Sequence, residues 1–381
     1  MSGDGLSFDV VVIGAGIAGA SVAAELACAG RSVALLERES QPGYHTTGRS
    51  AALFSETYGP APIRALSRAS ARFYDDPPAG FANGPLLTPR GVLMVARADQ
   101  LESVAAMLDE LAGRGEMVRL DGARAKTMAP LLRDGYAAAA VYEEGARDID
   151  VHGLHHGYLR RFRAAGGVLL PDREVLALER DGAGWLVETR QGSLSAGVLV
   201  NAAGAWADEV GAMAGAAPVG LSPRRRTAMI LAAPEGMDSS GWPMVVDIDE
   251  EFYLKPDAGR LLASPADETP SPPCDAQPEE YDVALCIERI EAAFDLKVAR
   301  VENRWAGLRS FVADRVPVAG FDAKEPGFFW LAGQGGYGIQ SAPALARLAA
   351  GLVLGRPLPD DIAAEGVTEA ALSPSRPELA R

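Results

Sequence analysis

The glycines near the N-terminus are spaced as in loops that bind phosphate groups. The segment Gly14–Gly19 reads Gly-Ala-Gly-Ile-Ala-Gly; an apolar, β-branched run, Phe8–Ile13, precedes it and an alanine-rich segment follows it. This order predicts a strand, a tight turn and a helix. Gly14 permits the turn, Gly16 lets the backbone approach a pyrophosphate, and Gly19 allows close packing of the helix on a sheet. The free amides and positive dipole end of the helix would face the phosphates.

An acidic residue stands where a ribose-binding group is expected. Val33–Leu36 predicts a second buried strand, and Glu37 follows it, about twenty residues after the glycine motif. Its carboxylate can accept hydrogen bonds from ribose hydroxyls and disfavours a 2′-phosphate, which argues against NADP. The motif alone does not separate NAD from FAD. The alternative is a glycine-rich turn in a βαβ unit that binds no nucleotide.

Two later segments favour FAD over NAD. Arg38–Ala52 is a polar, turn-rich loop that passes into small residues, which suits backbone lying beside a flat ring system; a plain surface loop is the alternative. Gly333–Gln340 is a second glycine-rich turn, between a buried strand expected at Phe328–Ala332 and a helix expected at Ser341–Leu354. Such a turn is a second anion- or carbonyl-binding device. An NAD enzyme has no need of it, whereas a protein that holds an extended FAD does.

Composition argues against several classes of partner. The chain has 381 residues, 48% hydrophobic and 23% charged, which fits one large or two ordinary globular domains. Its formal net charge of −15 argues against nucleic acid and anionic membrane surfaces. No apolar run approaches the roughly 18 residues of a membrane-spanning helix, and no basic N-terminal region indicates a signal peptide. We therefore expect a cytoplasmic protein that meets the inner membrane, if at all, through its electron acceptor.

Cysteines and histidines indicate no metal site. The three cysteines lack metal or redox spacing, and Cys28 is expected in the core, on the first helix. His152, His155 and His156 share one predicted helix, Val151–Ala165, but no acidic or cysteine partners cluster nearby. We expect no metal ion and no disulfide framework.

The predicted elements follow the order of an α/β chain with two excursions. Hydrophobic periodicity predicts helices at Ile63–Tyr74, Leu101–Leu111 and Tyr281–Phe294, and strands at Gly91–Ala96, Ala137–Tyr142, Arg226–Leu231 and Glu251–Lys255. Residues from about 56 to 146 and from about 217 to 304 form the excursions. Between them, the segment Val198–Trp206 is expected to be a buried strand that ends in small residues, where doubly wound sheets hold ligands. Ser264–Gln277, rich in proline and acid, is expected to be an exposed loop.

Five motifs, spread over nearly the whole chain, carry a family resemblance. They are VVIGAGIAGAS, the Tyr44–Ser50 loop, LVNAAGAWAD, WAGLRSFVAD and AGQGGYGIQ. Together they resemble the D-amino acid oxidase superfamily of FAD enzymes, which includes sarcosine and glycine oxidases. Within it, the chain is most similar to FAD-dependent D-amino acid dehydrogenases of the D-arginine dehydrogenase type.

The resemblance implies two domains and noncovalent FAD. Residues 1–55, 147–216 and 305–381 would form a Rossmann-like, glutathione-reductase-like FAD domain. Residues 56–146 and 217–304 would form an α+β substrate domain whose antiparallel sheet covers the reactive face of the flavin. Relatives that attach flavin through cysteine carry it near the late Arg-Ser strand, where this chain has Leu308–Ser310 and no cysteine.

The resemblance further implies oxidative deamination of a D-amino acid. The α-hydrogen moves with its electron pair from Cα to flavin N5, and the imine then hydrolyses to a 2-oxo acid and ammonia. The flavin performs the redox chemistry, so the protein must anchor the carboxylate, accept the neutral amine and aim the C–H bond. The implied partners are a small amino acid and an electron acceptor such as a quinone or another carrier. A monomer or homodimer is expected.

An arginine and a tyrosine are the expected substrate anchors. Arg309 lies in a motif similar to the family's substrate-binding segment, and a guanidinium binds a carboxylate through two parallel hydrogen bonds and keeps its charge when buried. Tyr253 matches a tyrosine that helps to hold the same carboxylate, with a core aromatic as the alternative. Arg226 aligns with a substrate-side position, whereas Arg224 and Arg225 are expected to be solvated.

Tyr58 and Gly336 complete the expected catalytic group. Tyr58 follows the flavin loop and could border the site, although it could also serve packing alone; Gly336 would supply a backbone group. No general base is obvious, so we expect the amine to lose its proton to water or a weak network. The residues expected to contact the cofactor are Gly14, Gly16, Ile17, Ala18, Gly19, Glu37, Arg38, Thr46, Thr47, Gly48, Arg49, Ser50, Ala51, Ala52, Leu53, Val175, Ala202, Ala203, Gly204, Trp206, Gly307, Arg309, Gly335, Gly336, Tyr337, Gly338, Ile339 and Gln340.

Two departures from the D-arginine type bear on the substrate. Those relatives place an acidic residue after a Pro-Arg pair and a histidine after the Ser-Ala-Ala of the flavin loop; here the positions are Gly91 and Leu53. An apolar pocket cannot repay the desolvation of a cationic side chain, so we expect a neutral or apolar substrate side chain. The alternatives are an oxygen-using oxidase of D-amino acids, an enzyme for glycine- or sarcosine-type amines or 2-hydroxy acids, and a non-catalytic flavin-binding protein. An NAD dehydrogenase is disfavoured by the second glycine loop.

Overall fold

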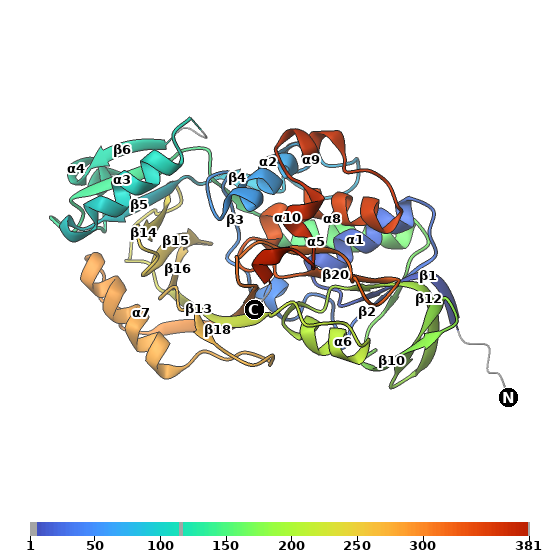
Figure 1. Cartoon of the computed structure of the whole chain (residues 1–381). Helices are drawn as coiled ribbons and strands as arrows, with labels where there is room; N and C mark the ends of the chain where they lie inside the picture. The colour runs from blue at the N-terminus through green and yellow to red at the C-terminus, as the bar shows by residue number, and fades with distance from the viewer. Residues whose placement is uncertain (1–5, 114–116, 380–381) are drawn as a thin grey trace.

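The computed structural model describes residues 6–113 and 117–379. The first of its two large sheets has eight strands (Figure 1). β1 (Leu6–Ile13) runs parallel to β2 (Val33–Leu36) on one side and to β12 (Gly192–Asn201) on the other. The remaining strands are β9 (Val168–Leu170), β10 (Val175–Asp181), β11 (Gly184–Thr189), β19 (Val318–Phe321) and β20 (Phe328–Ala332). The central strands are buried on both faces, which explains their unbroken apolar sequences.

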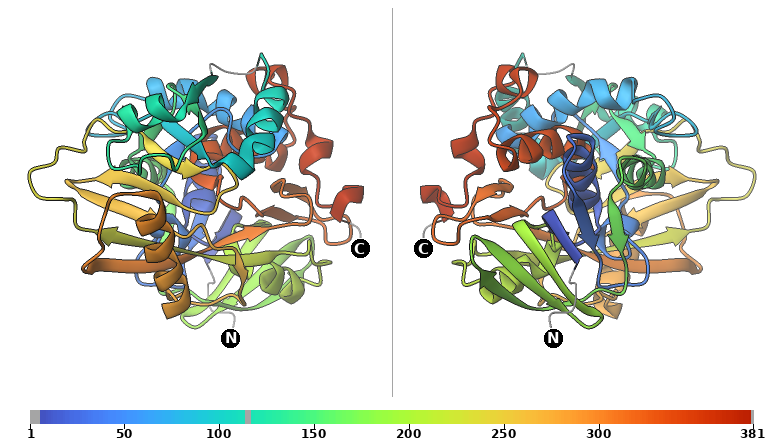
Figure 2. Two further views of the ribbon diagram at one scale, coloured as in Figure 1. Left: turned by 90° about the vertical axis from the view of Figure 1, so that its left-hand side faces the viewer. Right: turned by 90° about the vertical axis from the view of Figure 1, so that its right-hand side faces the viewer.

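Helices cover both faces of this sheet. The covering helices include α1 (Ile17–Cys28), α5 (Val151–Ala164), α6 (Ala207–Met213) and α8 (Gly338–Val353). Figure 1 shows α1, α5 and α8 above the sheet and α6 below it. Val10 and Val12 of β1 pack on the first side and Val11 on the other, as strand alternation requires. In the right-hand view of Figure 2, α1 and β1, both blue, lie near the middle of the molecule.

The second large sheet has nine strands, is mostly antiparallel and lies at the left in Figure 1. Its strands are β5 (Val92–Ala96), β6 (Met117–Asp121), β7 (Ala139–Glu143), β13 (Ser222–Leu231), β14 (Met244–Asp247), β15 (Tyr253–Asp257), β16 (Arg260–Ser264), β17 (Thr269–Pro270) and β18 (Val301–Phe311). Its helices are α3 (Leu101–Glu110), α4 (Gly122–Met128) and α7 (Glu280–Ala293). β18 pairs with β13 across the domain boundary expected at residue 305, so that strand belongs to this sheet over its whole length.

Short elements complete the chain. A three-stranded sheet comprises β3 (Leu53–Phe54), β4 (Leu87–Pro89) and β8 (Arg147–Ile149), and the remaining α-helices are α2 (Ala61–Asp75), α9 (Asp360–Ala364) and α10 (Glu369–Leu372). Within the described ranges, no helix combines the length and hydropathy needed to span a membrane. No group of three or more His, Cys, Asp or Glu side chains suited to a metal ion occurs in that part of the chain.

Three expectations about exposure were wrong. Arg225 is buried and pairs with Asp282 at 2.9 Å, because it faces α7 rather than solvent. Cys28 ends α1 on its outer side and is exposed. The segment 264–277 is not simply an exposed loop: Asp267 lies beneath β13, where its carboxylate accepts a hydrogen bond from the Thr227 amide.

Candidate active site

The two glycine loops line one cavity. The Gly14 loop, the end of β2, the segment 43–51, the segment 202–206, β18 and the Gly335 loop all contribute to its wall. Most of the expected cofactor residues line it. They are Gly14, Gly16, Ile17, Ala18, Glu37, Arg38, Thr46, Thr47, Arg49, Ser50, Ala51, Val175, Ala202, Ala203, Gly204, Trp206, Gly307, Arg309, Gly335, Gly336, Gly338 and Ile339.

Three of the expected cofactor residues line neither this cavity nor the one beside it. At Gly19, an added Cβ would lie 1.8 Å from the Gly14 carbonyl oxygen, so this glycine serves helix packing. Gly48 closes a turn in which its amide donates to the Gly43 carbonyl. Tyr337 is buried against the rings of Tyr58 and Phe311.

Side chains from other segments hold the Gly14 loop at one end of the cavity. The Ala15 amide donates to the Glu37 carboxylate at 3.0 Å, and the Ile17 amide donates to Thr47 Oγ1 at 2.9 Å. Burial raises the pKa of Glu37, and the amides that it accepts oppose that rise. His155 Nε2 lies 2.9 Å from the Ala15 carbonyl oxygen. These contacts hold the Gly14 loop in place.

The segment 46–49, in the loop expected beside the flavin, is hydrogen-bonded to β18. Thr46 Oγ1 donates to the Leu308 carbonyl at 2.8 Å, and Arg49 Nη1 donates to the Ala306 carbonyl at 2.9 Å. Trp305 Nε1 donates back to the Arg49 carbonyl at 2.9 Å. At the wall of the cavity, these hydrogen bonds connect the segment 46–49 to β18 of the nine-stranded sheet.

A second cavity adjoins the first at the expected substrate anchors. Arg226, Tyr253, Arg309 and Gly336 line both cavities, and Tyr58 lines the second. The expected cofactor residues Ala52, Leu53 and Gln340 also lie on the second cavity. Its wall is largely apolar, with the side chains of Val92, Met94, Met107, Leu111, Met117, Met244, Val246 and Ile248.

The two arginines at the junction differ in their partners. Arg226 is buried; its Nε donates to the Asp267 carbonyl at 2.8 Å and its Nη2 lies 3.2 Å from Glu268 Oε1. Burial and the nearby Arg309 lower the pKa of Arg226. Arg309 has no carboxylate within ion-pair distance among residues 6–113 and 117–379. Its burial opposes the charge, but Tyr58, Tyr253 and Glu250 hold the pKa of Arg309 above its ordinary value.

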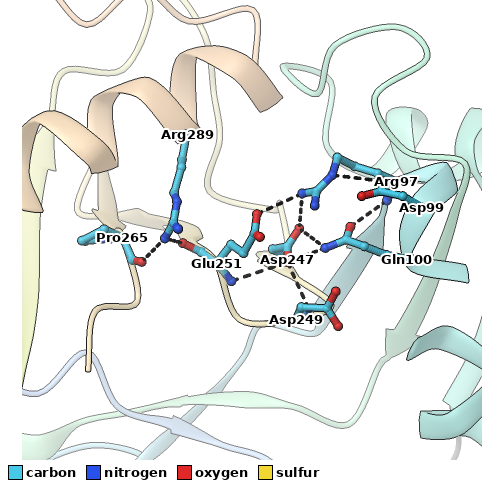
Figure 3. Close-up of polar contacts among 8 residues, drawn as sticks. All are labelled: Arg97, Asp99, Gln100, Asp247, Asp249, Glu251, Pro265 and Arg289. Carbon is cyan, nitrogen blue, oxygen red and sulfur yellow. Dashed lines mark hydrogen bonds and ion pairs between the residues drawn. The ribbon is translucent and has the colours of Figure 1, made fainter. Parts of the chain in front are cut away.

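The turn that leads into Tyr253 is fixed by a polar network (Figure 3). The buried Asp247 carboxylate accepts hydrogen bonds from Gln100 Nε2 at 3.0 Å and from Arg97 at 3.2 Å. Arg289 donates to the Glu251 carbonyl at 2.5 Å. Between them Glu250 has a φ of 57°, a left-handed conformation that is uncommon for a residue other than glycine, and it lines the second cavity.

The first cavity fits FAD. Gly14, with a φ of 98°, would place a Cβ 2.5 Å from the Ala202 carbonyl oxygen, so only glycine allows this turn. α1 starts at the cavity without an acidic residue in its first turn, and so presents its positive end to an anion. At the other glycine loop, Gln334 Nε2 is buried without a hydrogen-bond partner and lines the cavity. A polar ring system at that end would satisfy it.

The parallel strands at the centre of the first sheet, the Gly14 loop and the second glycine loop are the features of an FAD-dependent oxidoreductase. A family model described as "DAO: FAD dependent oxidoreductase" matches residues 9–352, and the chain belongs to this family. Its cofactor is accordingly FAD.

Among curated proteins, glycine oxidase of Geobacillus kaustophilus is 26% identical over 358 residues, covering 91% of this chain and 93% of that protein. The uncharacterized oxidoreductase YurR of Bacillus subtilis is 26% identical over 369 residues, covering 91% and 95%. The crystal structure of the Geobacillus glycine oxidase superposes with a TM-score of 0.83 at 23% identity, over 97% of this chain and 99% of that one. That superposition confirms the expected fold of an FAD domain with a second domain.

Sequence reasoning missed several cavity residues. The first cavity is also lined by Arg173, Glu174, Glu209, Val210, Met213 and Gln334. The second is also lined by Ser55, Thr57, Glu143, Asp247 and Glu250. Glu143 ends a strand that the sequence pattern closed one residue earlier, and a single acid at a strand end carries no recognisable signal.

Proposed function

We propose that the protein oxidatively deaminates a D-amino acid to the 2-oxo acid and ammonia and passes the electrons to a quinone or another carrier. One observation supports this most strongly: Arg309, without a carboxylate partner in the described part of the chain, lies where the cofactor cavity meets a second, apolar cavity. A guanidinium in that position is suited to bind the carboxylate of a small acid through two parallel hydrogen bonds.

The other anchors act on the same carboxylate in this proposal. Tyr253, buried on β15, and Tyr58, on the loop after β3, lie beside Arg309, and their hydroxyl groups would donate hydrogen bonds to the carboxylate. Arg226 adds positive charge but stays bound to the Asp267–Glu268 segment. Bound FAD would supply the acceptor for the α-hydrogen and its electron pair. The apolar wall keeps water from the reacting carbon, and the substrate amine loses its proton to water or a weak network.

The side chain of the substrate would extend along the methionine-rich wall. This lining supports the neutral or apolar side chain expected from Gly91 and Leu53. The D configuration rests on the resemblance of the motifs to D-amino acid dehydrogenases. None of the residues that line the first cavity is a cysteine, which supports noncovalent FAD. The division into an FAD domain and a substrate domain at the expected residues, apart from β18, belongs to the same proposal.

A second candidate is oxidation of glycine or another small amine with oxygen as acceptor. The likeness to glycine oxidase favours it. The space in front of Val92, Met94 and Met244 argues against it, because glycine would leave that wall without contacts.

The test is an anaerobic screen for bleaching of the flavin absorbance. The panel pairs D- and L-forms of norleucine, methionine, phenylalanine and lysine, and adds glycine, sarcosine and 2-hydroxy acids. We expect D-norleucine, D-methionine or D-phenylalanine to bleach the flavin and their L-forms to fail. Bleaching by L-forms, by glycine alone or by hydroxy acids would overturn the proposal. Peroxide formed in air at the turnover rate would favour the oxidase.

A further inference from the structure

A carboxylate without a cationic partner lies in the wall of the second cavity. Glu143 ends β7 opposite Val92 of β5, and only 6% of its surface is exposed. In residues 6–113 and 117–379, no lysine or arginine lies within ion-pair distance of it. Burying a carboxylate is costly unless other groups satisfy it, so its retention here calls for an account of what it holds.

The hydrogen-bond partners of Glu143 lie on one short segment and are the hydroxyl groups of Ser55 and Thr57 and the backbone amide of Glu56. Glu143 Oε2 accepts hydrogen bonds from Ser55 Oγ and from Thr57 Oγ1, each at 2.8 Å. Burial raises the pKa of Glu143, and the bonds from Thr57 and Ser55 oppose that rise. Hydrogen bonds to a charged acceptor are about twice as strong as those between neutral groups. The Glu143 carboxylate is therefore one of the groups that hold the turn at residues 55–57 in place.

A second contact steadies the same segment from the cofactor side. Gln340, on α8, accepts a hydrogen bond from the Ser55 amide at 3.3 Å and lies 3.5 Å from the Tyr58 carbonyl oxygen. Tyr58 directly follows this turn. The centroid of its ring lies 5.0 Å from that of Tyr337, and it lines the second cavity together with Arg309. Any shift of the turn moves the Tyr58 hydroxyl relative to the arginine.

We propose that Glu143 is a positioning residue, which holds the turn at residues 55–57 so that Tyr58 stays beside Arg309 and both grip the substrate carboxylate. The inference rests on the proposed function, because it gives Glu143 its role in binding the acid group that all substrates share. It makes Glu143 indifferent to the substrate side chain.

Glu143→Gln tests this, with Glu144→Gln as the matched control. Glu144 is the next residue and is exposed. In the FAD-loaded enzyme, we expect Glu143→Gln to raise KM roughly tenfold, the effect of losing about one hydrogen bond, with a smaller change in kcat. The factor should be the same for D-norleucine, D-glutamine and D-lysine. Glu144→Gln should match the unmodified protein.

Two results would overturn the proposal. An unchanged KM would show that Glu143 does not act through Tyr58. A selective change for D-lysine or D-glutamine would show that Glu143 contacts the side chain of the substrate instead. If Glu143→Gln does not fold, Thr57→Val removes one donor of the same contact and should give the same uniform rise.

A double-mutant cycle isolates the link to Tyr58. Once Glu143→Gln has displaced the hydroxyl, Tyr58→Phe should cost little more, whereas additive effects would refute the link. Titration of the oxidised holoenzyme with benzoate reports carboxylate binding without turnover. A weaker benzoate affinity in Glu143→Gln, in a protein that oxidises no amino acid, would sustain the positioning role and reject only the proposed function.

Discussion

Replacing Arg309 by methionine should separate activity from stability. Arg309 has no carboxylate partner in the described part of the chain, and its neighbour Arg226 carries a like charge. Burial opposes the charge of the guanidinium, but Tyr58, Tyr253 and Glu250 favour it and hold the pKa of Arg309 above its ordinary value, so the two effects largely offset each other in folding. Methionine fills a similar volume without charge, so we expect the free energy of unfolding to stay the same or to rise by up to about 1 kcal/mol.

Activity should fall steeply in the same variant. Removing one partner of a buried, hydrogen-bonded charge pair costs about 2–5 kcal/mol, which corresponds to roughly 30- to 4,000-fold in kcat/KM. Lysine at the same position keeps the charge but loses the two parallel hydrogen bonds. The kcat/KM of Arg309→Lys should therefore lie between that of the unmodified enzyme and that of Arg309→Met. The assay is kcat/KM for the best D-amino acid with an artificial acceptor, alongside thermal unfolding of the FAD-loaded protein.

Arg304 provides the matched control. It lies on the same strand, is exposed and pairs with Glu280 at 2.7 Å, so Arg304→Met should leave kcat/KM unchanged. The reasoning fails if Arg309→Met keeps kcat/KM within threefold of the unmodified enzyme. It also fails if that variant loses several kcal/mol of stability, because the arginine would then serve the fold and not the substrate.

Two further predictions concern the phosphate-binding loop. Burial lowers the pKa of His155 from 6.5 to about 4. As the pH falls from 6.5 towards 4, the unfolded state binds a proton that the folded state does not bind. The free energy of unfolding therefore keeps its full value above pH 6.5 and falls by up to about 3 kcal/mol towards pH 4. Urea unfolding at pH 7 and 4.5 should show a smaller loss for His155→Gln, and equal losses would contradict this account. Gly14→Ala should destabilise the protein and weaken FAD binding by well over the ~1 kcal/mol of a left-handed backbone alone. Gly30→Ala is the control, because Gly30 has a φ of 85° but no atom within 4 Å of an added Cβ; equal effects of the two changes would remove the clash from the explanation.

The sequence predicted best what local pattern encodes. The strand at Phe8–Ile13, the glycine turn and the helix after it appear as expected, because a buried parallel strand needs an unbroken apolar run and the turn needs glycine. The second glycine loop and its helix also lie where predicted, as α8 shows. The family model and the superposition with glycine oxidase confirm the fold and the FAD cofactor.

What the sequence could not predict depends on contacts between distant residues. Glu143 meets Ser55 and Thr57 across more than 80 positions, and Asp267 meets Thr227 across 40. Neither pair has a periodic or motif signal, since each depends on which strands become neighbours. The prediction of an exposed loop at 264–277 was wrong for this reason, because its Asp267 and Glu268 side chains bind to Thr227 and Arg226 of β13.

Strand register decides which arginines can serve the site. In the antiparallel pair β13–β18, Arg224 stands opposite Arg309 and Arg226 stands opposite Gly307. Since side chains alternate along a strand, Arg226 and Arg309 share one face of the sheet, whereas Arg225 points to the other, where it pairs with Asp282. A slip of one residue in β18 would send Arg309 to the α7 side and remove its guanidinium from the cavity. The pairing of these two strands is therefore as necessary to the proposed chemistry as the arginine itself.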